Sequence, residues 1–479
     1  MPDAESMSHA DDGRGSGGRA AVRAACVLLA LACLPAIIRA VLSVPLHLSL
    51  NYNEGWNAYH TLDLVSGRAL YSHTRSFFFN NYPPLSFYIV AAWTRVAGDP
   101  IVAGRTLSMA AFLLWTIVLA RAAERFGIRH PDAWFGALSF AATTLLFTDY
   151  VGIDDPQLLG DAIAASGLLV LQRAPRTVPR LFVAALLFSI GVFIKQNLIA
   201  LPLACIAWLL TTDRSAGWRL IGLGAVCGAA GFAVFAMLCG PGFVIQLMDP
   251  RAYLPLKGVW MAVQWIVRWL AALGLLWIVC RQRPDDEAVR FCAIYVCIAG
   301  GIGFVLSGGA GTNWNVLFDA SWAVCLGIAV VLDRWRRAEQ RGWLMAACLI
   351  VPAIAVVAGV RPESRSAGYW LTPRSAEAAD AARGIDFLAH HDGPALCEDL
   401  ALCFWAGKPV EVDVFNTQQN ILRGKVDAAD LVRLVEAHYF GAVQMEPSPR
   451  DLGGGASQAL RRRYRVDHED VTGWYLLPR

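Results

Sequence analysis

The sequence predicts a mainly α-helical, polytopic membrane bundle of about eleven transmembrane helices that carries a small α/β domain at its C-terminal end. Hydrophobic residues make up 56% of the 479-residue chain, above the roughly 45–50% of ordinary soluble domains. The mean hydropathy is +0.45. Long apolar windows recur along residues 21–360, whereas residues 361–479 alternate short apolar and polar segments. The first of these two regions therefore belongs in a lipid bilayer.

Residues 1–20 are rich in Gly, Ser, Asp and Arg, and we predict that they form a disordered cytoplasmic segment. The apolar run that follows is too long for the hydrophobic region of a cleaved signal peptide, so it is the first crossing. Residues 84–97 lie between prolines and are too short to cross, which favours an interfacial or re-entrant helix. The predicted crossings are residues 22–44, 103–121, 132–150, 156–172, 181–194, 197–211, 219–239, 258–280, 289–307, 315–332 and 342–359.

The distribution of arginine sets the orientation of this bundle. If residues 84–97 do not cross, every short arginine-rich loop lies on the same side as the N-terminus, as the positive-inside rule requires. The N-terminus is then cytoplasmic, residues 45–102 form the first outer loop, and residues 361–479 form an outer domain. The net charge of +3 gives the chain no electrostatic footprint for nucleic acid.

The stretch from Asn51 to Tyr71 in the first outer loop predicts an amphipathic helix at the membrane surface. Glu54 lies in the positively polarised first turn, directly after Asn53. Asn57 and Tyr59 add an amide and a ring to the same helix. A polar, aromatic helix beside an apolar bundle is a suitable place for a water-soluble group to meet a lipid-borne one.

Acidic residues at the outer end of the fourth predicted crossing form a second polar group. Asp154 and Asp155 lie at its mouth, and Asp161 lies deeper, on the same helix face as Gln157. Acids inside a span are costly and normally face a cavity or a partner. Asp154 can instead cap the helix, and Asp161 can pair structurally with an arginine.

Two cations stand in unusual places. Lys195, followed by Gln196, ends the fifth crossing in a chain that has only four lysines, and a compact ammonium at the membrane surface suits a phosphate. A lysine that simply snorkels to the surface is the alternative. Arg268 lies within a crossing and requires a partner, which is either a ligand or an acid such as Asp161 or Asp319.

The turn before the tenth crossing gathers amides and a carboxylate on the outer side. Asn315 and Asp319 lie one helical turn apart, with Asn313 just above them, and Lys257 ends a nearby outer loop. These side chains suit a sugar, although they suit a polar contact between helices equally well. Carboxylates and amides also suit Mg²⁺ or Mn²⁺, so a divalent metal is possible, but nothing in the sequence requires a cofactor.

The C-terminal segment, residues 361–479, predicts a domain with its own core. PALCE, KPVEVDVF, GAVQM and GWYLLP are the predicted extended segments, and DLALCFWAG and AADLVRLVEAHYF are the predicted helices. The domain has no phosphate loop or nucleophile motif, so we expect it to cover a catalytic cavity or to bind an acceptor. Cys397 and Cys403 form a possible disulfide if the domain is extracytoplasmic, and the other cysteines lie in hydrophobic segments.

The order of these motifs resembles that of the C-type (GT-C) membrane glycosyltransferases. The motifs are NEG with aromatic residues after the first crossing, then PPLSFYIVAAWTRVAGDPIVAGRTLS, DDPQ and FIKQNLIALP. The similarity covers roughly residues 20–335 and is greatest to the branch of the protein O-mannosyltransferases and the lipid A aminoarabinose transferase. Residues 21–360 would then be the GT-C catalytic domain.

The resemblance implies a multi-pass enzyme of a bacterial inner membrane with its C-terminal domain in the periplasm. Such an enzyme moves a sugar from a polyprenyl-phosphate donor to a hydroxyl of a glycan, lipid or protein acceptor, with inversion. Family acids and a family lysine match Glu54, Asp155 and Lys195, the first two as candidate bases. Where relatives carry a further acid, this chain has Asn53, and an amide cannot accept a proton.

The donor phosphate needs a cation, and the candidates are Lys195, Arg75, Arg268 and Lys257. The residues expected to bind substrate are Asn53, Asn57, Tyr59, Asp154, Lys195, Gln196, Asn313, Asn315 and Asp319. Two other functions compete with this interpretation. A lipid or sugar transporter or flippase is disfavoured because no sequence repeat is evident and the charges gather at one face. A noncatalytic membrane assembly protein is suggested by Asn53.

Overall fold

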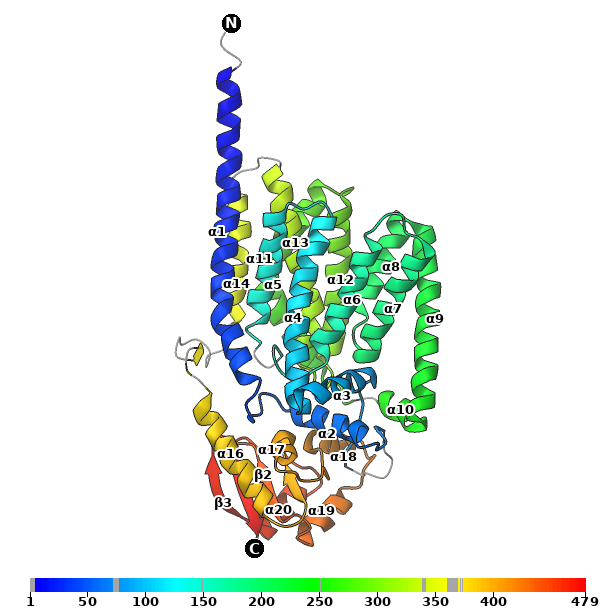
Figure 1. Cartoon of the computed structure of the whole chain (residues 1–479), viewed down its shortest axis with the longest axis vertical. Coiled ribbons are helices and arrows are strands. Elements are labelled where there is room, and N and C mark those ends of the chain that lie inside the picture. The colour runs from blue at the N-terminus through cyan, green and yellow to red at the C-terminus, as the bar shows by residue number, and fades with distance from the viewer. Residues whose placement is uncertain are drawn as a thin grey trace.

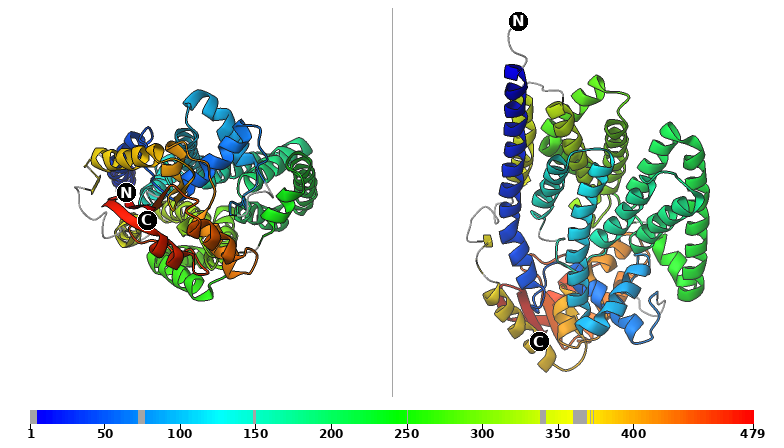
Figure 2. Two further views of the ribbon diagram at one scale, coloured as in Figure 1. Left: turned by 90° about the horizontal axis from the view of Figure 1, so that it is seen from below. Right: turned by 45° about the horizontal axis from the view of Figure 1, so that its top comes forward.

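The computed structural model describes residues 5–71, 77–147, 150–249, 251–337, 342–359, 369–370, 372 and 374–479. A helical bundle forms most of the molecule, and the C-terminal domain lies against the end of the bundle opposite the N-terminus (Figure 1). Helices α2 (Asn53–Val65) and α3 (Leu85–Ala97) lie between them. The right-hand view of Figure 2 again places the short helices and the C-terminal domain at the end of the bundle opposite the N-terminus.

Each predicted crossing coincides with one helix in the described part of the chain. These helices are α1 (Glu5–Ser43), α4 (Pro100–Arg125), α5 (His130–Thr144), α6 (Gln157–Leu171), α7 (Val178–Ile194), α8 (Ala200–Thr212), α9 (Arg214–Cys239), α11 (Pro255–Gln282), α12 (Glu287–Ser307), α13 (Phe318–Arg337) and α14 (Gly342–Gly359). Among the described residues, 6 helical segments are long and apolar enough to cross a membrane, and they lie in α1, α4, α9, α11, α12 and α13. Several others are apolar but shorter, so the number of crossings stays a prediction.

Two boundaries differ from those expected. Helix α1 begins at Glu5, inside the segment for which we predicted disorder, and no proline interrupts the chain from there to Pro35. Helix α5 ends at Thr144, before the predicted boundary at residue 150. A further short helix, α10 (Pro241–Leu247), follows α9 because Gly240 has a φ of 73° and turns the chain between them.

Helix starts follow ordinary capping chemistry. The Asp99 side chain accepts hydrogen bonds from the first free backbone N–H groups of α4, and Asp286 does the same for α12. Helix α3 spans 13 residues, or about 20 Å at 1.5 Å per residue, well short of a bilayer core of about 30 Å. This length agrees with the prediction that it does not cross.

Small residues let the helices of the bundle approach closely. A Cβ on Gly160 of α6 would overlap Leu198, and one on Gly191 of α7 would lie 3.1 Å from Ala164. The core around them is apolar and aromatic, with Trp115 of α4 stacked on Trp322 of α13 at 6.4 Å between ring centroids. The bundle is therefore a packed scaffold that fixes the ends of its helices.

The C-terminal domain is a four-stranded sheet with helices. Its strand order is β1 (Ala395–Cys397), β2 (Ala442–Met445), β4 (Gly473–Pro478) and β3 (Tyr464–Asp470), with β1 parallel to β2 and the other pairs antiparallel. The helices are α16 (Ser375–His390), α17 (Leu400–Trp405), α18 (Val414–Leu422), α19 (Ala428–Glu436) and α20 (Ala456–Arg463). KPVEVDVF does not join the sheet, because Val412 bridges to Phe77 of the first outer loop instead.

The C-terminal domain is attached to the bundle through that loop. The backbone N–H of Asp413 donates to the carbonyl of Phe77 at 2.8 Å, and Thr417 Oγ1 donates to the same carbonyl at 3.0 Å. Helix α17 packs directly on α2, where a Cβ on Gly55 would overlap the backbone of Ala401. The domain consequently covers α2.

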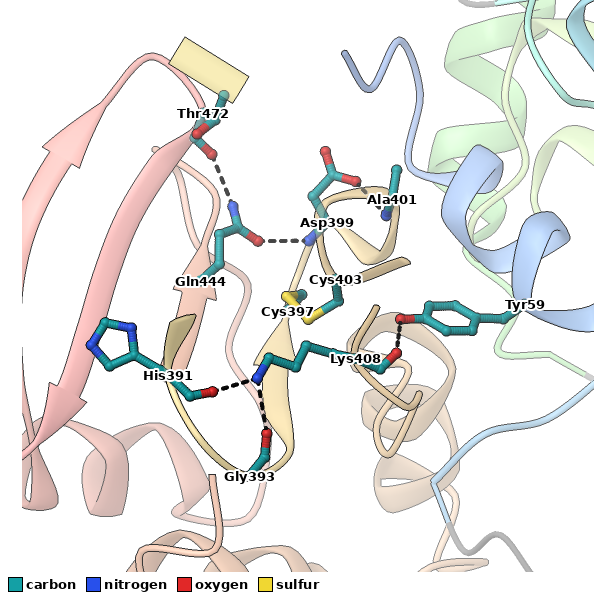
Figure 3. Close-up of a disulfide and its surroundings, with 10 residues drawn as sticks. All are labelled: Tyr59, His391, Gly393, Cys397, Asp399, Ala401, Cys403, Lys408, Gln444 and Thr472. Atoms are coloured by element: carbon teal, nitrogen blue, oxygen red, sulfur yellow. Dashed lines mark hydrogen bonds between the residues drawn. A yellow bond between two sulfur atoms is a disulfide. The ribbon is translucent and has the colours of Figure 1, made fainter. Parts of the chain in front are cut away.

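A disulfide joins Cys397 at the end of β1 to Cys403 in α17 (Figure 3). Nearby, Lys408 follows α17, and its carbonyl accepts a hydrogen bond of 2.7 Å from Tyr59 of α2. The disulfide therefore braces the helix that contacts the first outer loop. The pairing agrees with the one predicted for an extracytoplasmic domain.

Candidate active site

The Glu54 carboxylate in the first turn of α2 is fully buried and fully engaged. Arg105 of α4 donates Nε to Oε1 at 2.7 Å and Nη2 to Oε2 at 2.8 Å. The backbone N–H groups of Leu50 and Asp154 donate to the two carboxylate oxygens as well. Arg105 also binds the carbonyls of Ser43, Val44, Leu46 and Leu48. This pair joins α1, α2, α4 and the loop before α6.

Asp155 and Lys195 form the second buried ion pair of the site. Lys195 Nζ lies 2.8 Å from Asp155 Oδ1 and 3.2 Å from Oδ2. Asn53 Nδ2 donates to Asp155 Oδ2 at 3.2 Å, so the amide of α2 contacts the acid directly. Burial disfavours the charged form of Lys195, but the electrostatic attraction of Asp155 and Tyr82 favours it. The pKa of Lys195 is therefore raised above its usual value. The structure thus brings together residues 53, 155 and 195.

Two adjoining cavities open beside this pair. The larger has a volume of ≈ 400 Å³ and is lined by Lys195, Gln196 and Asn315, among others. The smaller, of ≈ 160 Å³, lies under the C-terminal domain and is lined by Asn313 and Asn416, among others. Residues lining both are Asn53, Asn81, Tyr82, Tyr150, Arg251 and Gly311. Asn53 therefore stands where the two cavities meet.

Asn57 and Asp154 lie behind the ion pair, outside the lining of both cavities. Asn57 Nδ2 donates to the Asp154 carbonyl at 2.5 Å. The Asp154 side chain is buried against Gly104, and its Oδ2 has no hydrogen-bond partner in the described part of the chain. Burial, with the nearby Glu54 and Asp155 carboxylates, raises the pKa of Asp154 well above its usual value. Like Tyr59, which contacts Lys408, these residues support the site from behind.

Gln157 links the deeper polar residues. Its Nε2 donates to Asp161 at 2.9 Å, and its Oε1 accepts from Asn315 at 3.1 Å. The side chains of Asp319 and Asn315 have different partners. Asp319 accepts a hydrogen bond from Tyr295 of α12, whereas Asn315 donates to Gln157. Only the amide of the predicted Asn315 and Asp319 pair reaches the larger cavity.

Two of the four predicted phosphate cations, Lys257 and Arg268, do not line either cavity. Lys257 Nζ binds the turn before α13, where it donates hydrogen bonds to the carbonyls of Gly309 and Thr312 at 3.0 and 2.6 Å. Arg268 pairs with neither Asp161 nor Asp319, the acids expected for it. Arg75 lies outside the described residues.

Arg268 is instead a contact between helices. Its Nε donates to the carbonyl of Ala355 in α14 at 3.0 Å, and its guanidinium lies 5.0 Å from the ring centroid of Phe147. Gly359 leaves the space for the guanidinium, since a Cβ there would overlap it. Lys195 is therefore the predicted cation that lines a cavity in the described structure.

The sequence did not single out two arginines and several rings of the site. Arg251, just after α10, lines both cavities, and Arg450, from the C-terminal domain, lines the smaller one. Tyr82 lies with its ring centroid 5.1 Å from Lys195 Nζ. The arginines had no signal to distinguish them from 35 others, because only the fold brings distant loops together.

Among the described residues, no group of three or more His, Cys, Asp or Glu side chains is placed to hold a metal ion. Asp155 is close to Asn53 and Lys195, and the other acids near it are bound by Arg105 or buried behind it. The charged groups of the site are thus carboxylates, the Lys195 ammonium and arginine guanidinium groups.

Comparison with known proteins gives this arrangement a context. The model of the family described as dolichyl-phosphate-mannose-protein mannosyltransferase matches residues 81–238. The crystal structure of ArnT from Cupriavidus metallidurans bound to undecaprenyl phosphate is similar over 94% of this chain and 97% of ArnT, with a TM-score of 0.62 and 15% identity. The chain therefore shares the fold of ArnT. A search of curated proteins by sequence finds no match.

Other solved structures agree on the GT-C fold. ArnT from Cupriavidus metallidurans in the apo state gives a TM-score of 0.61, also at 15% identity and over 94% of this chain and 97% of that chain. The oligosaccharyltransferase of Archaeoglobus fulgidus tethered with an acceptor peptide gives 0.53 at 9% identity, over 87% of this chain and 69% of that chain. The expected GT-C fold is confirmed. At these identities the likeness extends to the fold, and the roles of single residues rest on the geometry above.

Proposed function

We propose that this GT-C protein transfers a sugar from a polyprenyl-phosphate donor to an acceptor hydroxyl on the periplasmic face, with Lys195 at the leaving phosphate and Asp155 as the base. The observation that carries the proposal is the buried Asp155–Lys195 pair, in which Lys195 lines the larger cavity and Asp155 is contacted by Asn53, a residue that lines both cavities. Such a transfer needs a base at the incoming hydroxyl and a cation at the leaving group. The pair supplies both.

The larger cavity suits the donor phosphate. Lys195 lines it directly, and Arg251 adds a second cation that makes no ion pair with any described residue. Gln196 and Leu247 also line an apolar groove of ≈ 380 Å³ over α7, α8 and α9, which suits a prenyl chain. The ArnT structure holds undecaprenyl phosphate, a ligand of this same chemistry.

Lys195 couples donor binding to the base. In the structure both oxygens of Asp155 are contacted by Lys195, which leaves the carboxylate covered. When a donor phosphate binds Lys195 Nζ, the ammonium is shared, and Asp155 Oδ2, which then keeps only the hydrogen bond from Asn53 Nδ2, can accept a proton. The acceptor oxygen then attacks the anomeric carbon, its proton passes to Asp155, and the C–O bond to the phosphate breaks, which inverts the anomeric centre.

Glu54 fits this chemistry less well than Asp155, although both matched family acids. Its oxygens already accept from Arg105 and from two backbone N–H groups, so it has little capacity to take a proton. We assign Glu54 to positioning of α2. Asn53, in turn, donates to Asp155 and orients its carboxylate.

The disulfide and the arginine distribution support a periplasmic C-terminal domain. Disulfides such as Cys397–Cys403 persist in oxidising compartments and are rare in the cytosol. The arginines at the ends of α4 and α13 lie at the other end of the bundle from α2 (Figure 1). A bacterial inner membrane with a cytoplasmic N-terminus fits both.

The test is sugar transfer by the purified full chain in nanodiscs, from a panel of radiolabelled polyprenyl-phosphate sugars, with and without Mg²⁺ or Mn²⁺. Asp155→Asn should lower transfer by at least 100-fold, the usual range for a lost general base, while undecaprenyl phosphate still binds. Wild-type transfer from none of the donors, or transfer by Asp155→Asn at the wild-type rate, would overturn the proposal. Movement of an intact lipid across sealed vesicles without bond cleavage would instead indicate a flippase.

A further inference from the structure

The smaller cavity has a one-sided charge. Its described lining contains Arg251 and Arg450 but no Asp or Glu. A concave site lined by charge of one sign concentrates ligands of the opposite sign. Its volume of ≈ 160 Å³ is below the roughly 300 Å³ at which pockets for drug-sized ligands begin, so it has room for one small group.

Arg450 is held in a fixed orientation in this cavity. Its guanidinium carbon lies 4.8 Å from the ring centroid of Tyr52 and 5.3 Å from that of Phe415. Its backbone N–H donates to the fully buried Glu398 at 2.9 Å, and its Nε lies 3.7 Å from the same oxygen. Its Nη1 is buried without a hydrogen-bond partner among the described residues. A guanidinium fixed in this way retains an unused donor.

The other lining residues are the kinds that bind sugars. They are amides and aromatic rings, which can contact hydroxyls and the apolar face of a pyranose: Asn51, Asn53, Asn81, Asn313, Asn416, Tyr52, Trp56, Tyr82, Tyr150 and Phe415. The C-terminal domain contributes Phe415, Asn416 and Arg450 to the lining of the smaller cavity. No described residue of this domain lines the larger cavity.

We propose that the smaller cavity binds an anionic saccharide group of the acceptor, and that Arg450 recognises its carboxylate or phosphate. This deepens the proposed function and rests on it, because the donor phosphate is assigned to Lys195 in the larger cavity. The two cavities share Asn53, which contacts Asp155, so an acceptor in the smaller one meets the donor at the proposed base. Arg450 is thus a determinant of acceptor specificity contributed by the covering domain.

The test uses sugars that share the glucose ring and differ in the charged or neutral group at C6. Binding of D-glucuronate, D-glucose 6-phosphate and neutral D-glucose to the full chain in nanodiscs is measured by saturation-transfer NMR. Wild-type protein should bind at least one charged sugar tenfold or more tightly than glucose, and which one it prefers distinguishes carboxylate from phosphate. Arg450→Met should remove the preference, and Arg450→Lys should retain part of it. Arg465→Met, an exposed arginine of the same domain, is the control.

Undecaprenyl phosphate binding is measured on the same samples. Retained lipid binding by Arg450→Met shows that the variant is folded and that the two sites are separate. No preference for a charged sugar in wild type, or an unchanged preference in Arg450→Met, overturns the assignment of Arg450. If Arg450 selects charged sugars but no lipid-linked sugar is transferred, the proposed function fails while this anion site stands.

Discussion

Glu54→Gln should destabilise the protein far more than an ordinary surface substitution. The glutamine keeps one acceptor oxygen but presents an NH₂ group to Arg105, so one of the two bonds at 2.7 and 2.8 Å is replaced by opposed donors. Arg105 is fully buried and would keep an uncompensated charge. Removal of one partner from a buried pair costs about 3–5 kcal/mol, a large part of the roughly 5–15 kcal/mol that stabilises a typical domain.

Thermal unfolding in nanodiscs at one scan rate measures this effect, with sugar transfer followed on the same samples. The matched control is Glu377→Gln, an exposed glutamate on α16 whose nearest arginine contact is 3.6 Å, for which a cost below about 1 kcal/mol is expected. If Glu54→Gln unfolds with wild-type stability and yet loses transfer completely, Glu54 is the base. The assignment of that role to Asp155 would then be wrong.

Three further predictions follow from other contacts. Lys195→Met should weaken undecaprenyl phosphate binding by about tenfold or more, since charge-assisted hydrogen bonds contribute about 1.5–3 kcal/mol, whereas Arg465→Met, at an exposed position of β3, should not. Gly55→Val should push α17 away from α2 and speed proteolysis of the C-terminal domain, whereas Gly274→Val, with nothing within 4 Å, should not. Burial raises the pKa of Asp399 from 3.8 to about 7. The folded state therefore binds the extra proton, unfolding free energy should fall as pH rises from about 4 to 7, and Asp399→Asn should flatten that slope.

Much of the fold could be predicted because apolar length and arginine position are local properties of the sequence. The apolar helices of the bundle, the short α3 and several strands of the C-terminal domain were found in this way. KPVEVDVF failed because its partner is Phe77, more than 300 positions away, rather than a neighbouring strand. Helix α16, α18, α20 and strand β3 were missed because their apolar residues are few and are buried only by the assembled sheet.

The sequence predicted which residues belong to the candidate site better than it predicted what each of them contacts. Asp155, Lys195 and Asn53 do meet, since each lies at or next to a helix end. The sequence pattern does not reveal that Arg105 forms an ion pair with Glu54. Nor does it reveal that Lys257 and Arg268 donate hydrogen bonds to backbone carbonyls. Those outcomes depend on which helix faces approach each other in three dimensions.

The cover over α2 has a consequence for how substrates arrive. Phe77, Tyr52 and Tyr59 each bind the C-terminal domain, so its position over the proposed catalytic pair is fixed at several points. A lipid-linked donor would then enter laterally from the bilayer along α7 and α9. Its turnover would depend on how many donor molecules share each patch of membrane, and saturation curves would be expressed in mole fraction of lipid rather than in bulk molarity.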